Sequence, residues 1–336
     1  MRGFLAVLVF ALAAVAQAAP PAPTGPLSPE HKALFEGVNQ DAPPEKLSAV
    51  REDLEGRHYL TCDENWLDKW YDRLQDLGGI YAGVGTDQGY VFIGWMKPVV
   101  SWMTDYDPWV QRVHQMYAVA FADSADIDAF IDWWNPKKAA QTKAHLLTAL
   151  PGDEADNKKT LIVYDGWGAK IYRRLIKLRG WFKERKVASF VTDDTQYAWV
   201  RQHVLDGRVK PVLCNLLDEK CFVSLGDIAR KLEVPMRALY TSNAEGYWPY
   251  PQQFRENMYA QNFDEKSLIL RTLASKKRNG DYRYNSQTGF SFQAWLRDAR
   301  SRSVGNVVPY QAVKDENDIP VSHIDNEPPP PKEKKP

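Results

Sequence analysis

Two glycines followed by a carboxylate form the pattern in this sequence that is most typical of a ligand site. Gly83 and Gly85 follow the short apolar run 80–82, and Asp105 stands 22 residues after Gly83, at the end of a second apolar run. Glycine lets the backbone approach a ligand closely because no Cβ occupies the space. A carboxylate at the end of the neighbouring strand accepts hydrogen bonds from two ribose hydroxyls. The spacing therefore indicates a nucleoside site.

The glycine pattern is shorter than a dinucleotide fingerprint. Gly83 and Gly85 are followed by Thr86, Asp87 and Gln88, so the third glycine of G-x-G-x-x-G is missing. This argues against NAD or FAD and favours a nucleoside without a pyrophosphate, such as S-adenosylmethionine. Thr86 and Asp87 supply residue types that begin helices. The alternative interpretation is a plain strand–turn–helix–strand crossover that binds nothing.

Polar residues also follow several other apolar runs. Because the carboxyl ends of parallel strands meet at one edge of a sheet, we expect these residues to line one crevice there. The predicted cofactor-binding set is Gly83, Gly85, Thr86, Asp87, Asp105, Asp107, Asp193, Asn215, Ser242, Asn243 and Glu245. A competing interpretation is that Asp105 and Asp107 only cap the helix that begins at Pro108. No catalytic residue can be assigned, and no cysteine or histidine spacing predicts a metal site.

The elements that would position this set alternate along the chain. Strand-like runs at 80–82, 99–103, 187–191, 209–217, 236–240 and 267–273 are separated by helical segments, with a strand pair expected at 282–296. Such alternation predicts an α/β fold with a mostly parallel sheet flanked by helices. A helical insertion is expected at 135–172, with 164–168 as a lid or rim, followed by a basic helix at 171–186. An amphipathic helix is expected at 63–77, and shorter ones at 29–38 and 44–55.

The ends of the chain predict export. Residues 1–18 combine Arg2, an apolar run and an A-x-A site, which is typical of a secretory signal peptide. The expected organisation is 1–18 signal peptide, 19–58 linker and N-terminal helices, 59–306 the α/β domain, and 307–336 a disordered Pro-rich tail. Cleavage leaves 318 residues with a net charge of −1 and no stable membrane anchor, so we expect a periplasmic or extracellular protein that does not bind nucleic acid. In an oxidising compartment Cys214 and Cys221 could close a short loop and leave Cys62 free; three unpaired thiols are the alternative.

Several separated motifs carry a family resemblance: GGIYAGVGTDQGY, TDYDPWVQRVHQMY, SFVTDDTQY, GRVKPVLCNLLDEK and LYTSNAEGYWPY. They resemble an uncharacterised family of bacterial, often exported proteins whose sheet is similar to the Rossmann-like fold of class I S-adenosylmethionine-dependent methyltransferases. The resemblance implies a cofactor loop at Gly83 and Gly85 and a ribose acid at Asp105 or Asp107. It also implies that Asp193 lies near the adenine and Asn215 near a catalytic strand end.

Two departures from the methyltransferase pattern are visible. No acid precedes the glycine loop, and the residues after Asn215 are Leu216 and Leu217 rather than the Pro-Pro-Tyr of amino-methylating members. The predicted function is therefore an exported protein with a methyltransferase-like domain that binds a nucleoside-type small molecule. The alternative is a non-catalytic envelope or binding protein on a degenerate methyltransferase-like scaffold. A hydrolase is disfavoured because G-x-S-x-G is absent and His114 and His203 have no evident nucleophile partner.

Overall fold

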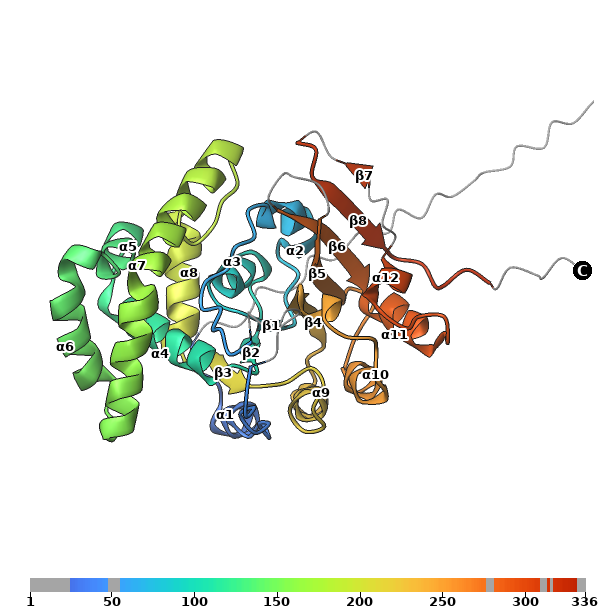
Figure 1. Ribbon diagram of the computed structural model, residues 1–336, viewed down its shortest axis with the longest axis horizontal. Coiled ribbons are helices and arrows are strands. Elements are labelled where there is room, and N and C mark those ends of the chain that lie inside the picture. The colour runs from blue at the N-terminus through green and yellow to red at the C-terminus, as the bar shows by residue number, and fades with distance from the viewer. Residues whose placement is uncertain (1–24, 48–54, 276–280, 309–312, 315–316, 331–336) are drawn as a thin grey trace, which may run out of the picture.

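The computed structural model describes residues 25–47, 55–275, 281–308, 313–314 and 317–330 (Figure 1). The predicted signal peptide, residues 1–18, lies outside the described residues. Residues 48–54 of the helix predicted at 44–55 also lie outside the described residues. Its described residues 44–47 are not helical.

An eight-stranded sheet with the order β3-β2-β1-β4-β5-β6-β8-β7 forms the centre of the molecule. β3, β2, β1, β4 and β5 run parallel, and β6 is antiparallel to β5. The predicted pairing is confirmed: β1 and β2 are parallel neighbours, with Ile80 beside Val100. The strand order reverses between β1 and β4, which is where ligands bind in open α/β sheets. The first five strands are β1 (Ile80–Val84), β2 (Val100–Asp105), β3 (Val209–Leu213), β4 (Met236–Ser242) and β5 (Leu268–Ala274).

The far edge of the sheet corrects two predictions. Within the tail predicted to be disordered, β8 (Pro320–Ile324) pairs parallel with β6 (Tyr282–Thr288), and β7 (Val313–Lys314) pairs with β8. The tail thus satisfies backbone groups that β6 would otherwise leave unpaired. Of the strand pair expected at 282–296, the first strand is present as β6, but helix α11 (Gly289–Arg297) takes the place of the second. Phe292 and Leu296, four residues apart, both face the core, and this is helical spacing.

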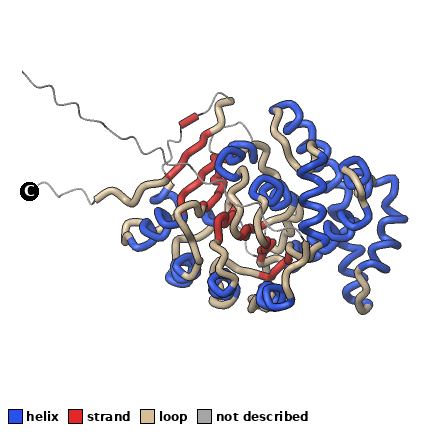
Figure 2. The backbone as a smooth tube through the Cα atoms, turned by 180° about the vertical axis from the view of Figure 1, so that it is seen from behind, coloured by secondary structure: helices blue, strands red, loops and turns tan. Residues whose placement is uncertain are grey.

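Helices cover both faces of the sheet. One core contains side chains of α3 (Asp87–Met96), α4 (Pro108–Asp123) and α7 (Glu154–Arg185). The other core contains side chains of α1 (Pro29–Glu36), α9 (Cys221–Lys231), α10 (Gln252–Tyr259) and α11. Viewed from behind, the helices between β2 and β3 gather on one side of the strands (Figure 2). The predicted α/β class with a mostly parallel sheet between helices is therefore confirmed.

Every regular element between β2 and β3 is a helix. The helical insertion is therefore larger than the predicted 135–172. After α4 it contains α5 (Ile127–Trp133), η3 (Pro136–Lys138), α6 (Ala139–Ala149), α7 and α8 (Asp194–Leu205). The predicted lid at 164–168 lies in the middle of α7, where Tyr164 and Gly168 are buried. The strand predicted at 187–191 is a turn, in which the N–H groups of Thr192 and Asp193 both donate to the Ser189 carbonyl. Phe190 and Val191 are buried from this turn, and a short apolar run does not distinguish a buried strand from a buried turn.

The amphipathic helix predicted at 63–77 is much shorter, comprising η2 (Leu67–Trp70) and α2 (Tyr71–Leu74). Trp70 and Leu74 are buried. The preceding residues 58–66, called the strap below, contain no helix or strand. The remaining short helices are η4 (Ala244–Gly246) and α12 (Val304–Val307). Among the described residues, no helix combines the length and apolarity needed to cross a membrane.

Candidate functional site

The glycine turn and the carboxylate predicted to face a ligand bind each other. Asp105 accepts hydrogen bonds from the Gly85 N–H at 3.0 Å and from the Asp107 N–H at 2.9 Å, one on each carboxylate oxygen. Gly85 has a φ of +90°, which favours glycine, and a Cβ there would lie 2.1 Å from Nε2 of Gln88. Burial, with the nearby Asp107 adding to it, raises the pKa of Asp105 to about 7. The predicted juxtaposition is present, and it holds the turn in shape.

Asp107 caps helix α4, as the competing interpretation proposed. One of its oxygens accepts the Trp109 N–H at 2.8 Å, and the other lies 2.7 Å from Nδ1 of His58. The His58 ring stacks on Trp109 with ring centroids 3.6 Å apart and meets Trp167 edge-on. His58 thus links the strap to the start of α4.

The strap contacts two of the residues predicted to line the crevice, Asp87 and Ser242. Glu64, which is 2% exposed, brings its carboxylate to the ends of β4 and β5. One oxygen accepts hydrogen bonds from Ser242 at 2.9 Å, from Thr272 at 2.9 Å and from the Tyr240 hydroxyl. The other oxygen accepts from the Cys62 thiol at 2.7 Å. Ser242, a predicted ligand contact, is therefore used by the chain itself.

Further bonds fix the strap on both sides of Glu64. The Cys62 N–H donates to Asp87 at 2.8 Å, and Arg174 donates to Asp87 at 2.9 Å and to the Glu64 carbonyl at 2.8 Å. The N–H groups of Asn65 and Trp66 donate to the Tyr284 hydroxyl at 3.1 and 2.9 Å. A segment held by so many buried bonds is a permanent part of the fold, because releasing it would leave several polar groups unpaired.

Burial shifts the pKa values of two side chains of the strap, Glu64 and Cys62. It raises the pKa of Glu64, although hydrogen bonds from Cys62, Tyr240 and Thr272 oppose this. Burial, followed by the neighbouring Glu64, raises the pKa of the Cys62 thiol well above its usual value. A nucleophilic cysteine requires a thiolate, so this environment disfavours nucleophilic chemistry at Cys62.

Predicted residues around β1 and α3 are mostly used for close packing. A Cβ at Gly83 would lie 2.1 Å from the Tyr81 hydroxyl, which explains the glycine. Thr86 is buried, and its hydroxyl lies 3.3 Å from Asp87. Asp87 is fully buried and pairs with Arg174 rather than facing an open space.

The side chains of Glu245 and Asn243 also contact other side chains of the protein. Glu245 is 1% exposed, and it accepts from Arg271 at 2.9 Å, from Thr241 at 2.7 Å and from the Tyr250 hydroxyl. The Asn243 amide lies 3.5 Å from the Tyr247 hydroxyl. Glu245 therefore belongs to a buried ion pair and does not contribute to a crevice.

Asp193 lies away from the other predicted residues. It caps α8 by accepting the Gln196 N–H at 2.8 Å, and Gln196 lies against Gly94 in the last turn of α3. Gln196 therefore packs near the end of α3, away from the glycine turn at the start of that helix. Residues 187–191 form a turn, so the strand end expected to carry Asp193 to the carboxyl edge is absent.

Asn215 lies at the carboxyl edge but outside the glycine turn. The neighbouring Cys214 N–H donates to the Asp105 carbonyl at 2.8 Å. The Asn215 side chain accepts the Leu217 N–H at 3.0 Å and so shapes its own loop. Of the cysteine alternatives, the disulfide is present: Cys214 is bonded to Cys221, and Cys62 is free.

Sequence reasoning missed His58, Glu64 and Arg174. Glu64 stood inside an expected helix and Arg174 inside a basic run expected to be solvated, yet Arg174 is 7% exposed. No local pattern marks either residue, because each is defined by a partner 87 or more residues away.

A family model described as "Domain of unknown function (DUF7790)" matches residues 59–325. No curated protein matches the chain at a significant level.

Proposed function

The chain belongs to this family of unknown function, DUF7790, and from that premise we propose that it is an exported, non-catalytic binding protein. In this proposal it keeps a sheet similar to that of a class I methyltransferase but takes no S-adenosylmethionine-type nucleoside at the carboxyl edge. The observation that carries the proposal is the position of Glu64.

The hydroxyl groups at the strand ends support this choice. A nucleoside bound at the switch point would need polar groups of β4 and β5 and the carboxylate of Asp105. Ser242 and Thr272 donate to Glu64 instead, and both oxygens of Asp105 hold backbone N–H groups. A ligand would have to break these bonds before making its own, which lowers its net affinity.

Two observations support the scaffold and the compartment. The parallel order β3-β2-β1-β4-β5 is that of a doubly wound Rossmann-type sheet. The disulfide between Cys214 and Cys221 is of the kind that persists in oxidising compartments. Mass spectrometry of the mature protein would test export: we expect Ala19 at the N-terminus, and an intact Met1 on a cytoplasmic protein would contradict it.

A thermal-shift panel tests the absence of a nucleoside. The mature protein is melted with millimolar S-adenosylmethionine, S-adenosylhomocysteine and adenosine. A ligand at 100 times its Kd would add about 2.7 kcal/mol, which for a chain of this size is a rise of roughly 5 °C in melting temperature. We expect no such rise.

Two variants make the panel decisive. A rise with the unmodified protein that Asp105→Asn abolishes would overturn the proposal and restore the nucleoside site. Asp72→Asn is the matched control, because Asp72 is exposed and lies outside the site. A rise that both variants retain would place a ligand elsewhere on the molecule and leave the carboxyl edge unoccupied.

Acid–base chemistry is a second candidate, favoured by the contact between His58 and Asp107. A histidine whose Nδ1–H donates to a carboxylate presents its other nitrogen as a base, which can take a proton from water or a hydroxyl. His58 is partly exposed, so solvent reaches it. Hydrolysis of activated esters that falls at least a hundredfold in His58→Gln, with an unchanged melting temperature, would favour this candidate over the binding protein.

A further inference from the structure

The N-terminal arm, residues 25–47, is docked on the core although it lies before the family match. Phe35 of α1 stacks on Trp102 of β2 with ring centroids 5.5 Å apart. The Asn39 N–H donates to the Ser224 hydroxyl at 3.0 Å. The arm then follows the end of β3, where the Asp41 N–H donates to the Leu213 carbonyl at 3.0 Å.

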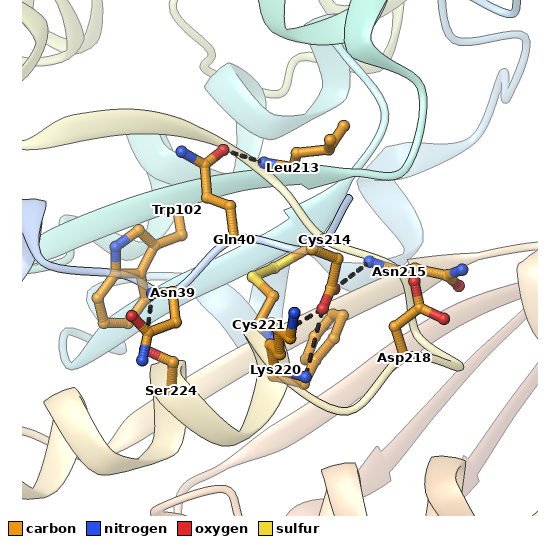
Figure 3. The surroundings of a disulfide bond; sticks show 12 residues. Asn39, Gln40, Trp102, Leu213, Cys214, Asn215, Asp218, Lys220, Cys221 and Ser224 are labelled. Carbon is orange, nitrogen blue, oxygen red and sulfur yellow. Dashed lines mark hydrogen bonds between the residues drawn. A yellow bond between two sulfur atoms is a disulfide. The ribbon is translucent and has the colours of Figure 1, made fainter. Parts of the chain in front are cut away.

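One carboxylate of the arm, that of Asp41, enters the loop 214–221. Asp41, which is 6% exposed, accepts the N–H groups of Asn215 at 2.9 Å, Cys221 at 3.1 Å and Lys220 at 3.3 Å. Figure 3 shows the three donor residues Asn215, Lys220 and Cys221 around the disulfide. The Asn215 N–H bonds one carboxylate oxygen of Asp41 and the N–H groups of Lys220 and Cys221 bond the other, so the loop presents three backbone donors to an anion.

Asp41 replaces a missing helix cap. Helix α9 begins at Cys221, and its N-cap residue Lys220 forms no side-chain capping bond within the described chain. The first N–H groups of a helix need an acceptor, and a carboxylate near this end is further favoured by the helix dipole. Asp41 supplies the acceptor and the negative charge, although it lies 180 residues from Cys221 along the sequence.

The disulfide closes the same loop. Cys214 follows the last residue of β3, Cys221 is the first residue of α9, and both are buried. The bond therefore fixes the distance between the end of the strand and the start of the helix. The donors on Asn215 and Cys221 stand on either side of that bond, so it also fixes their separation.

We propose that the loop 214–221 is a disulfide-closed carboxylate-binding site whose occupant is the chain's own Asp41, and that forming the disulfide locks the arm onto the core. Two thiols, Cys214 and Cys221, are oxidised to one disulfide while a disulfide-bearing oxidant of the export compartment is reduced to two thiols. Reduction lets the two donor groups move apart. Asp41 then loses its acceptor site, and the arm detaches from Trp102 and Ser224. This inference is independent of whether any ligand binds at the carboxyl edge.

Hydrogen exchange of the mature chain, followed by mass spectrometry, tests the lock. The oxidised protein is compared with protein reduced by a phosphine in the presence of a chelator, and thiol alkylation measures the extent of reduction. The chelator is needed because Asp41 and the two sulfurs lie within 4.8 Å of one another and, once reduced, could bind a divalent metal. We expect the amides of Asn39 and Asp41 to exchange at least tenfold faster after reduction, while amides of β1 keep their protection.

Variants separate the lock from a general loss of stability. Asp41→Asn should release the arm with the disulfide intact, and Cys214→Ser with Cys221→Ser should release it without reductant. Cys62→Ser is the matched control and should leave the protection of the arm unchanged, because Cys62 contacts Glu64 of the strap and lies outside the loop 214–221. Unchanged protection of the arm after complete reduction would overturn the proposal. Equal loss of protection in the arm and in β1 would also overturn it, because the disulfide would then stabilise the whole domain.

Discussion

Two buried glutamates beside the end of β4 are held by different kinds of partner. Glu245 faces the guanidinium of Arg271, and both side chains are almost completely buried. Among the described residues, the Glu64 carboxylate accepts only from uncharged donors, namely three hydroxyls and a thiol, and burial raises its pKa. The same residue type is thus held in an ion pair at one position and by hydroxyl groups at the other.

The difference shows what each cluster requires. An ion pair that loses one charge leaves the other unpaired in a low-dielectric interior. A carboxyl group held by neutral donors can become neutral without leaving a charge behind. The stability of the Glu245 cluster should therefore depend on the charge of the carboxylate. The stability of the Glu64 cluster should depend on the positions of its hydrogen-bond acceptors.

Glu245→Gln should have the largest effect. It leaves the Arg271 guanidinium buried without a counter-charge, and we expect a loss of about 3–5 kcal/mol in the free energy of unfolding. Urea denaturation followed by tryptophan fluorescence measures this. Glu265→Gln, at an exposed position, is the matched control. A loss below about 1 kcal/mol would remove the contrast between the two glutamates.

Asp87→Asn breaks the ion pair that lies within the strap cluster. We expect a loss of about 3 kcal/mol, at the lower end for a buried pair, because Arg174 keeps its bond to the Glu64 carbonyl. The same denaturation experiment applies. If Asp87→Asn cost less than Glu64→Gln, the strap would be held by Glu64 rather than by the ion pair.

Acid should weaken the fold through His114, a buried group at this edge. Its pKa is lowered to about 4 by burial, while one ring nitrogen lies 2.9 Å from the Gly85 carbonyl. As the pH falls from about 6.5 to 4 the unfolded state takes up the proton first, so stability decreases with acidity, by about 2 kcal/mol at pH 5 from this group alone.

Unfolding measured between pH 8 and pH 4 tests this contribution. His114→Gln should show a shallower acid loss, and the exposed His31→Gln should follow the unmodified protein. A residual slope is expected in His114→Gln, because burial also lowers the pKa of His203, to about 3. Asp105 acts in the opposite direction, since its raised pKa makes stability fall as the pH rises from about 4 to 7. Identical acid profiles with and without His114 would contradict the prediction.

Glu64→Gln should have the smallest effect. The amide oxygen can accept from the three hydroxyls while the amide nitrogen faces the Cys62 sulfur, so we expect a change below about 1 kcal/mol at pH 7. Because the pKa of Glu64 is raised, the unmodified protein loses stability as the pH rises above 4.5, and Glu64→Gln should lack this loss. A loss as large as that of Glu245→Gln would show that Glu64 also acts as a buried charge.

Local patterns were sufficient to predict the elements that meet at the switch point. The run 80–82, the turn at Gly85 and the Pro108 helix start were all correctly predicted, because strand, turn and cap preferences depend on neighbouring residues. The run 187–191 failed because burial alone does not specify a strand; pairing does, and β3 holds the place beside β2. The short run 320–324 failed for the opposite reason, since its strand exists through pairing with β6.

The sequence by itself determined the α/β class, the central β1–α3–β2 unit and the closeness of Gly85 to Asp105, since each of these depends on residues near one another in the chain. Only the tertiary structure decided what occupies the carboxyl edge. Glu64 reaches Tyr240, Arg174 reaches Asp87 and Asp41 reaches Cys221 across separations of 87 to 180 residues. Such contacts bury polar groups whose partners no local period or motif specifies, because the desolvation that makes each partner necessary arises only when the whole chain has packed.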